Sequence, residues 1–468
     1  MTSKHHSQNT SDEVEQPQSL YAKHEKIHPR IVLGFFTRLK ALSGFILLGI
    51  YYIFPWVQWD DRQAVLFDLP ARKFHLLGLT FWPQDFIYLT LLLMIAALAL
   101  FFFTSLAGRL WCGFACPQTI WTDAFLWMER LVEGDRPKQL KLDKAPLSFR
   151  KFRIKATKHT LWLVFALFTG FTFVGFFVPI RELTQEVMTF NLSGWETFWI
   201  LFYSLATYGN AGWLREQVCI YMCPYARFQS AMFDKDTMII AYDEKRGEPR
   251  GSRKREADYK VQGLGDCINC TMCVQVCPTG IDIRDGLQYQ CISCSACVDI
   301  CDEIMEKMDY PKGLIRYTTE NVLMGKPTRI LRPRIFIYGG ILLAIFIGIS
   351  VAVSNRSLVQ LDVIRDRNSL FRETQGGLIE NVYRLRILNI DNQPHIYDVT
   401  ATGIEGLQLN KDREIAVEPG GVMTLPVRLG VKSSQLKKRS NQIEFQLTAR
   451  ENSSITITEE ARFLGPFQ

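Results

Sequence analysis

Long uncharged blocks alternate with polar segments along the first three-quarters of this chain. Five blocks contain no charged residue and are long enough to cross a bilayer as helices: 41–57, 86–108, 160–180, 197–214 and 335–355. A helix rises about 1.5 Å per residue, so roughly 20 residues cross a hydrocarbon core of about 30 Å. The blocks therefore predict five membrane spans. The first and fourth are short, and buried core helices remain an alternative for them.

The segment before the first block is polar and carries histidine, lysine and glutamate. Such a composition buries too little apolar surface to fold, so residues 1–35 are predicted to form a disordered cytoplasmic tail. The first block ends in Tyr51, Tyr52, Pro55 and Trp56 rather than in the small residues of a signal-peptide cleavage site. We therefore expect an uncleaved membrane helix.

The net charge of +7 is unevenly distributed. Lysine and arginine concentrate between the second and third blocks and directly before the fifth, whereas the connections 58–85 and 181–196 hold few. The positive-inside rule then predicts five spans with the N-terminus in the cytoplasm and the C-terminus outside. The basic segment 136–158 is interpreted as a topology determinant beside anionic lipid, not as a nucleic-acid site.

Beyond residue 355 the hydrophobic pattern changes to a period of two. Segments such as NVYRLRILNI and NQIEFQLTAR alternate apolar and polar residues, and turn residues separate them. This pattern predicts an all-β sandwich of about seven strands over residues 357–468. The region contains no cysteine and one histidine, His395, so we expect no metal site there. An interaction surface and a structural cap both suit such a domain.

All twelve cysteines lie in segments that this topology places on the cytoplasmic side. The cytosol keeps thiols reduced, so metal binding or redox chemistry is favoured over disulfides. Eight cysteines form two C-x2-C-x2-C-x3-C motifs, CINCTMCVQVC and CISCSACVDIC. In two-cluster ferredoxins the fourth cysteine of each motif binds the other cluster. We therefore assign one 4Fe–4S cluster to Cys267, Cys270, Cys273 and Cys301, and the second to Cys291, Cys294, Cys297 and Cys277.

Two details around these motifs bear on the assignment. Pro278 follows the first motif as in ferredoxins, whereas Asp302 takes the proline position after the second. Zinc is the competing ligand, but zinc sites normally use pairs of C-x2-C rather than triplets. No G-x-G-x-x-G motif follows a predicted strand, so no flavin or nicotinamide domain is evident. Electrons must then come from another protein or from a diffusible reductant.

The other four cysteines form two C-x3-C-P motifs, WCGFACP and VCIYMCP, each directly after an even-numbered block. They are Cys112, Cys116, Cys219 and Cys223. The arrangement is an internal repeat of two spans and a cysteine pair, whose pseudo-symmetry could bring the four thiols together. On a helix, residues i and i+4 share one face. Pro117 and Pro224 are tolerated in a first helical turn, so each is predicted to begin an interfacial helix.

Four reduced thiolates at a membrane surface make a soft site, which favours Cu(I), zinc or an iron–sulfur centre. We take these four as candidate metal-binding or redox residues; the alternative is buried apolar thiols without a metal. Met222 lies between the second pair and could add a weak copper ligand, although ordinary packing is the simpler interpretation. For the lone histidines His75 and His159, hydrogen bonding is likewise simpler than metal ligation.

The span pattern, both kinds of cysteine motif and three further segments complete a pattern that resembles the CcoG/FixG/RdxA family. The segments are YDEKRGEPRG (242–251), CPTGIDIRDGLQYQC (277–291) and GLIRYTTEN (313–321). The resemblance covers nearly the whole chain after the tail. It implies a bacterial inner-membrane accessory protein for assembly of cbb-type cytochrome c oxidase, with an immunoglobulin-like C-terminal domain. It also implies a cupric reductase that passes Cu(I) to copper-transport and oxidase-assembly factors, with the eight ferredoxin-type cysteines as cluster ligands. The candidate catalytic and copper-binding residues are then Cys112, Cys116, Cys219 and Cys223.

The predicted fold is a multi-domain membrane protein that joins an α-helical transmembrane bundle, a two-cluster ferredoxin-like domain and an all-β sandwich. Its predicted parts are a tail (1–35), a four-helix transmembrane region (36–240), a cytoplasmic ferredoxin domain (241–325), a fifth transmembrane helix (326–356) and a periplasmic sandwich (357–468).

Three functions remain compatible with this organisation. The first is reduction of Cu(II) by electrons that enter through two 4Fe–4S clusters. The second is a membrane ferredoxin that passes electrons from quinol to a partner without copper. The third is a non-enzymatic copper-binding scaffold whose clusters are structural. The electron donor is unknown, no nucleic-acid partner is expected, and a homodimer is left open.

Overall fold

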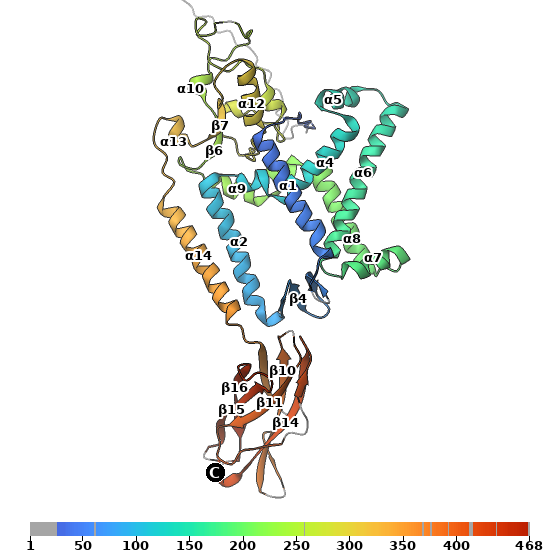
Figure 1. Ribbon diagram of the computed structural model, residues 1–468, viewed down its shortest axis with the longest axis vertical. Coiled ribbons are helices and arrows are strands. Elements are labelled where there is room, and N and C mark those ends of the chain that lie inside the picture. The colour runs from blue at the N-terminus through green and yellow to red at the C-terminus, as the bar shows by residue number, and fades with distance from the viewer. Residues whose placement is uncertain are drawn as a thin grey trace, which may run out of the picture. The chain divides into compact units, whose positions relative to one another are not determined.

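The computed structural model describes residues 26–59, 62–256, 258–366, 369–374, 377–391, 393–410, 415–436 and 438–466 (Figure 1). The chain forms two compact units, each assembled from three segments. Within the described residues, the first unit comprises the chain up to Tyr51, Phe101–Phe171 and Gly194–Arg332. The second comprises Tyr52–Leu100, Thr172–Ser193 and Pro333 onwards.

Among the described residues, four helical segments are long and apolar enough to cross a membrane. They are Phe35–Trp56, which contains α1 (Phe35–Ile53), α2 (Phe86–Ala107), α6 (Phe149–Val174) and α14 (Pro333–Ser354). Almost none of the α1, α2 and α14 windows is buried inside the protein, so their apolar side chains are free to face lipid. Four of the five predicted spans are thus confirmed as long apolar helices.

The fourth predicted span, 197–214, is not a single long α-helix. Helix α8 (Gly194–Thr207) ends after 14 residues, and a π-helical segment, η3 (Tyr208–Leu214), continues it. Two glycines lower the helix propensity of this segment. At Gly212, a Cβ atom would lie 3.2 Å from Trp162 and 3.4 Å from Phe125, so the glycine allows a close approach to the neighbouring helices. Tight packing thus favours the wider π-helix over a regular span.

Short helices and a small sheet complete the helical part of the first unit. Helix α4 is amphipathic and buries Phe125, Leu126 and Met128 against α6 and η3. The helices are α3 (Leu110–Phe114), α4 (Pro117–Glu133), α5 (Arg136–Lys144), the π-helical η4 (Val218–Met222), α9 (Pro224–Ala231), α10 (Glu244–Gly247), α11 (Met272–Gln275), α12 (Ala296–Lys307) and α13 (Glu320–Leu323). Strand β6 (Ile239–Tyr242) pairs antiparallel with β7 (Ile315–Thr318) and closes the ferredoxin-like region.

The prediction of a disordered tail over residues 1–35 is wrong for residues 26–35. Residues 1–25 lie outside the described part of the chain. His28 is buried, and its Nε2 atom lies 2.9 Å from an Asp143 carboxylate oxygen. Further on, the N–H of Arg30 donates to the carbonyl of Gln275 at 2.8 Å. The backbone N–H of Thr37, in the first turn of α1, donates to the Asp299 carboxylate at 2.8 Å. These ion pairs and hydrogen bonds, together with the packing of Val32 against Val276 and Ile300, order the segment.

The second unit contains the predicted β-sandwich, with nine described strands rather than about seven. One sheet has the order β12-β14-β10-β8, with β9 also paired to β10, and the other β13-β11-β15-β16. The strands are β8 (Val359–Arg365), β9 (Arg372–Glu373), β10 (Leu378–Asn389), β11 (His395–Thr402), β12 (Gln408–Asn410), β13 (Ile415–Val417), β14 (Val422–Lys432), β15 (Ser440–Ala449) and β16 (Thr456–Leu464). The two extra strands, β9 and β12, are short edge strands that a period-two pattern cannot define.

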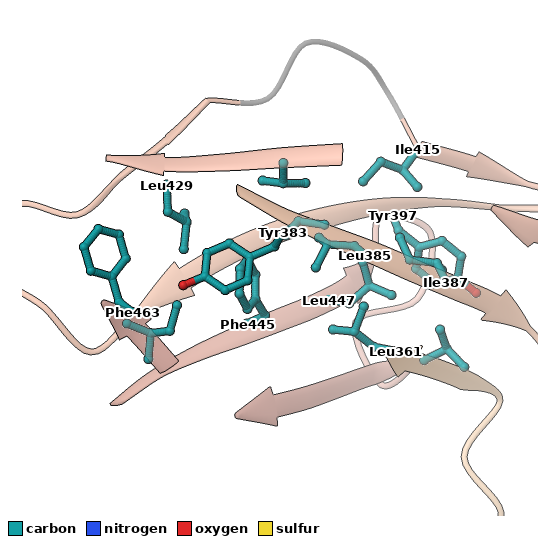
Figure 2. Close-up of a cluster of buried hydrophobic side chains, with 14 of the residues drawn as sticks. Leu361, Tyr383, Leu385, Ile387, Tyr397, Ile415, Leu429, Phe445, Leu447 and Phe463 are labelled. Atoms are coloured by element: carbon teal, nitrogen blue, oxygen red, sulfur yellow. The ribbon is translucent and has the colours of Figure 1, made fainter. Parts of the chain in front are cut away.

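The sandwich core follows the predicted alternation. Tyr383, Leu385 and Ile387 alternate along β10 and are fully buried, and they face Phe445 and Leu447 of the other sheet (Figure 2). A fully buried side chain of this kind contributes about 1.5–3 kcal/mol relative to an exposed one.

The rest of the second unit is small. It includes α7 (Ile180–Thr189) and the strands β1 (Gln58–Trp59), β2 (Arg62–Gln63), β3 (Val65–Asp68), β4 (Lys73–Leu76) and β5 (Leu79–Phe81). Strands β3, β4 and β5 form one antiparallel sheet in the connection between α1 and α2.

Candidate redox and metal site

The two C-x2-C-x2-C loops share an unusual backbone. In the first loop Asn269 and Thr271 have positive φ, and in the second Ser293 and Ser295 do so at the equivalent positions. Left-handed conformations are costly for residues other than glycine, so the surrounding structure must impose them. Each loop then leads directly into a helix, α11 or α12. The repeated left-handed positions show that both loops have the same backbone conformation.

The first set of thiols combines the first motif with the last cysteine of the second. Cys267, Cys270, Cys273 and Cys301 line one cavity. Burial raises the pKa of the Cys301 thiol to about 12, and the other three cysteines add to this shift. Burial also raises the pKa of Cys273, to about 11. Cys301 of the second motif thus lines the cavity formed by the first motif, as the predicted exchange of the fourth cysteine requires.

The second set of thiols mirrors the first. Cys277, Cys291, Cys294 and Cys297 line a neighbouring cavity, which Cys273 also borders. Burial raises the pKa of Cys294 to about 12 and that of Cys297 well above its ordinary value. Buried thiols resist ionisation because no opposite charge compensates the thiolate, and a bound cationic centre supplies that charge. Two sets of four converging thiols, of which all but that of Cys270 are buried or half-buried, therefore fit two 4Fe–4S clusters.

The C-x3-C-P pairs do not lie on one helical face as predicted. Cys112 lies within α3, but Cys116 is extended, with ψ of 128°, and caps the N-terminus of α4. Cys219 lies in η4, and Cys223 is extended and caps α9 in the same way. A proline disfavours helical backbone in the residue before it, so each helix breaks at the second cysteine. The prediction that both prolines begin a helix is confirmed.

The four thiols of the two pairs nevertheless come together. Cys112 interacts electrostatically with each of the other three, and Cys219 with Cys116 and Cys223. Burial raises the pKa of Cys112 and of Cys219 to about 12. Burial also raises the pKa of Cys116, although the backbone N–H groups of the first turn of α4 oppose this shift. The repeat thus produces a third thiol set.

The donor chemistry of the third set is that of soft sulfur. Across the part of the chain that the structure describes, no group of three or more histidine, cysteine, aspartate or glutamate side chains has the arrangement that would hold one metal ion. Soft thiolates suit Cu(I), zinc or an iron–sulfur centre.

Arg109 and Gly113 connect the third thiol set with the second. The buried Arg109 guanidinium donates to the carbonyl of Cys291 at 3.3 Å and lies in the electrostatic range of Cys112 and Cys219. A Cβ atom at Gly113 would lie 2.7 Å from the carbonyl oxygen of Ser293, so the two loops touch through backbone. Sequence reasoning used Arg109 only as a topology signal and missed this role. The glycine inside WCGFACP was the available sequence signal.

Gln229 also supports the third thiol set and was not predicted. Its side chain is fully buried, and its Oε1 atom accepts a hydrogen bond from the Cys112 thiol at 3.4 Å. Its Nε2 atom donates to the Gly108 carbonyl at 3.1 Å and to Thr104 at 3.2 Å. The thiol of Cys112 is therefore oriented by a side chain that is itself held in place.

The lone candidate ligands have ordinary structural environments. Met222 is 60% exposed. The Nδ1 atom of His159 lies 2.9 Å from the Tyr208 hydroxyl, and that of His75 lies 3.0 Å from the Thr80 hydroxyl. His395 lies 2.8 Å from an Asp391 carboxylate oxygen. The simpler interpretation of each histidine, a hydrogen-bonded side chain, is the one that the structure shows.

Comparison with known proteins supports these features. Residues 214–320 match a 4Fe-4S dicluster domain, residues 89–134 a 4Fe-4S binding domain, and residues 349–466 the domain described as an "IG-like fold at C-terminal of FixG". The 89–134 match contains the first C-x3-C-P motif, and the 214–320 match contains the second together with both ferredoxin motifs.

Curated relatives extend this similarity over most of the chain. Protein RdxB of Cereibacter sphaeroides is 40% identical over 425 residues, which are 88% of each chain. Nitrogen fixation protein FixG of Rhizobium meliloti is 34% identical over 93% of this chain and 91% of its own. A crystal structure of a FixG-related protein from Vibrio parahaemolyticus is 35% identical and covers 24% of this chain and all of its own, with a TM-score of 0.22.

Proposed function

Because the chain belongs to the FixG/RdxA family of iron–sulfur oxidoreductases, we propose that it reduces Cu(II) to Cu(I) for the assembly of cbb-type cytochrome c oxidase. The observation that carries the proposal is the junction of the second and third thiol sets. There Arg109 bonds to the carbonyl of Cys291, and Gly113 brings the WCGFACP backbone against the Cys291–Cys294 loop.

The first two thiol sets are the proposed ligands of the resident clusters. Two 4Fe–4S clusters, when bound, supply one-electron carriers whose potentials depend on local charge and hydrogen bonding. The chain contributes the strained loops that aim the thiols inward and the burial that keeps water from them. Cys273 borders both cavities, so the two sets lie next to each other.

The third thiol set is the proposed site of the copper substrate. Soft thiolates bind Cu(I) better than Cu(II), so they stabilise the product of a one-electron reduction. Burial raises the pKa of Cys112 and of Cys219 to about 12, and the Arg109 cation opposes this shift in part. Gln229 orients the Cys112 thiol by accepting its hydrogen bond. These residues would hold soft thiols beside the Cys291–Cys294 loop, and copper would replace their protons on binding.

The membrane arrangement of the proposed reductase follows the charge pattern. The four long apolar helices, with the α8–η3 segment as a fifth crossing, would place all three thiol sets on the cytoplasmic side of a bacterial inner membrane. The sandwich would then lie in the periplasm and offer a surface to copper-transport or oxidase-assembly factors.

The test uses the purified protein with its clusters reconstituted without oxygen. It is reduced with dithionite, freed of excess reductant and given Cu(II), while cluster absorbance and the signal of a Cu(I)-specific chelator are followed together. Clusters should reoxidise as Cu(I) appears. The variant Cys112→Ser/Cys219→Ser should lower the rate more than about 100-fold, the upper end for loss of an outer-shell partner. Met222→Leu, an exposed neighbour in the same motif, is the matched control and should leave the rate unchanged.

The alternatives give different results in the same assay. A copper-binding scaffold would bind Cu(II) while its clusters stay reduced. A third iron–sulfur cluster, which the 89–134 match makes a specific rival, would show iron content that falls by one cluster in the cysteine variant. Equal iron content in the variant and the wild type, with lost copper reduction, would support the copper site.

A further inference from the structure

A large apolar cavity in the first unit lies beside the second thiol set. Its volume is about 430 Å³, within the usual range for sites that bind small organic ligands. Helix α1 contributes Lys40, Gly44, Phe45 and Leu48, which share one face of that helix. Helix α4 contributes Asp123 and Trp127 among other side chains, and the ferredoxin-like region closes the cavity with residues that include Cys294.

The cavity is amphipathic along the axis of α1. Near its polar end, the Lys40 ammonium lies 2.7 Å from an Asp123 carboxylate oxygen, and both side chains line the cavity. Leu48 lies eight residues further along the helix, roughly 12 Å away, and the lining there is apolar. Phe45 is 75% exposed and Trp127 64% exposed, so the apolar part is open at the surface of a membrane-crossing helix. The cavity therefore continues the lipid-facing surface of α1 towards the thiols.

Cations and one carboxylate lie at the polar end. Lys40 is paired with Asp123, the Arg130 guanidinium donates to the carbonyl of Pro29 at 3.1 Å, and Arg30, which also lines the cavity, contacts the Met272 sulfur at 3.3 Å. This excess of cations would also attract an anionic lipid headgroup, so the experiment must distinguish a lipid from a quinol. A hydroxyl-bearing ring uses both members of the Lys40–Asp123 pair, because it accepts a hydrogen bond from the ammonium and donates one to the carboxylate.

We propose that this cavity binds an isoprenoid quinol, whose headgroup lies between the Lys40–Asp123 pair and Cys294, and that the quinol is the electron donor. The inference rests on the proposed copper reduction for its electron acceptor. Oxidation of the quinol to the quinone breaks its two O–H bonds and releases two protons to water past the partly exposed Asp123. The two electrons released reduce two Cu(II) ions to Cu(I) in successive one-electron steps.

Two glycines of α1 provide a matched pair of variants. The Cβ of a residue replacing Gly44 would meet only a methyl group of Ile120, at 4.0 Å, so Gly44→Phe would project into the cavity without a backbone clash. Gly49 lies on the same helix and does not line the cavity, and a Cβ atom there would meet no neighbouring atom within 4 Å. Gly49→Phe therefore adds the same side chain outside the site.

The experiment uses the cluster-containing protein in phospholipid nanodiscs, with decylubiquinone and its quinol as probes. Binding of the quinone is followed by quenching of tryptophan fluorescence, with Trp127→Phe to identify the quenched residue. Gly44→Phe should weaken binding by about tenfold or more, because its ring would occupy space that the quinone needs. The same variant should slow reduction of the clusters by the quinol, and Gly49→Phe should change neither.

The outcomes separate this site from the proposed function. Equal quinone binding by Gly44→Phe and by the wild type would overturn the quinol site. Quinone binding without reduction of the clusters would also overturn it and would identify the cavity as a lipid site. If quinol reduces the clusters but the dithionite-reduced protein does not reduce Cu(II), the copper proposal fails while the quinol site stands. If dithionite-reduced Gly44→Phe still reduces Cu(II), its loss of quinol oxidation is not a folding defect.

Discussion

Replacement of Glu129 by glutamine tests the buried ion cluster that holds α4 in place. Glu129 is fully buried, and its carboxylate accepts hydrogen bonds from Lys26 and Arg215, each at 2.5 Å. Lys158 lies 3.5 Å from the same carboxylate. The ring of Trp162 lies 4.7 Å from the Lys158 ammonium and 5.4 Å from the Arg215 guanidinium. Lys158 lies closer to the Glu133 carboxylate, at 2.9 Å, so Glu129 is the main counter-charge of Lys26 and Arg215.

The magnitude follows from the ionisation of this carboxyl. Burial alone would raise the pKa of Glu129, but Arg215 and Lys26 outweigh burial and lower the pKa from 4.5 to about 2. A shift of this size corresponds to about 3 kcal/mol, similar to the 3–5 kcal/mol lost when one member of a buried ion pair is removed. Because the folded-state pKa is depressed, this stability is fully present above pH 4.5 and is lost as pH falls towards 2.

The assay is chemical unfolding of the purified protein at neutral pH, followed by tryptophan fluorescence. We expect Glu129→Gln to lower the free energy of unfolding of the first unit by about 3 kcal/mol, with cations left uncompensated. The control is Glu303→Gln on α12, which removes an exposed pair with Lys307 and should cost no more than about 1 kcal/mol. An equal effect of the two substitutions would refute the argument that the cluster stabilises the fold.

Two further substitutions test the link between the second and third thiol sets, and a third tests the cap of α1. Gly113→Ala should lower the free energy of unfolding by about 1–3 kcal/mol and slow Cu(II) reduction, because its Cβ would lie 2.7 Å from the Ser293 carbonyl oxygen. Gly209→Ala is the control and should change neither, because its Cβ would meet no described atom within 4 Å. Equal rates for the two variants would contradict this expectation. Arg109→Met should lower the rate about tenfold without loss of cluster absorbance, and an unchanged rate would remove its role as a link. Asp299→Ala should lower the unfolding free energy by about 0.5–2 kcal/mol in denaturant titrations, because the first turn of α1 loses its cap; an unchanged midpoint would show that the cap is dispensable.

The grouping of the ferredoxin-type cysteines could be predicted because a short loop constrains its own geometry. A C-x2-C-x2-C segment keeps three thiols within a few residues of one another, and the exchange of the fourth cysteine follows the pattern of two-cluster ferredoxins. The β-sandwich was predictable for a similar reason, since one buried face per sheet imposes a period of two over each long strand. Local pattern and tertiary structure agree in both cases.

The geometry of the C-x3-C-P motifs could not be predicted from helical periodicity alone. The i,i+4 argument assumes one continuous helix, but the proline that begins α4 or α9 forces the preceding cysteine into extended backbone. The fourth predicted span, 197–214, does not form one long α-helix, for a different reason. Its hydrophobic content indicated a membrane helix, while close packing at Gly212 against Trp162 produced a π-helix that no local pattern signals.

Residues 26–34 show why the composition of a whole segment can mislead about the order of its end. This stretch, KIHPRIVLG, is more apolar than the residues before it, and its Val32 packs against Val276 and Ile300. Lys26 and His28 bind acidic partners on α4 and α5. Arg30 then hydrogen-bonds through its backbone to Gln275, at the end of α11, and the chain enters α1 under the Asp299 cap of α12. One short segment therefore ties the membrane-side helices to the helices that follow both cysteine loops. The proposed electron transfer requires those parts to keep a fixed separation, so the contacts of this segment would serve that transfer as well as the fold.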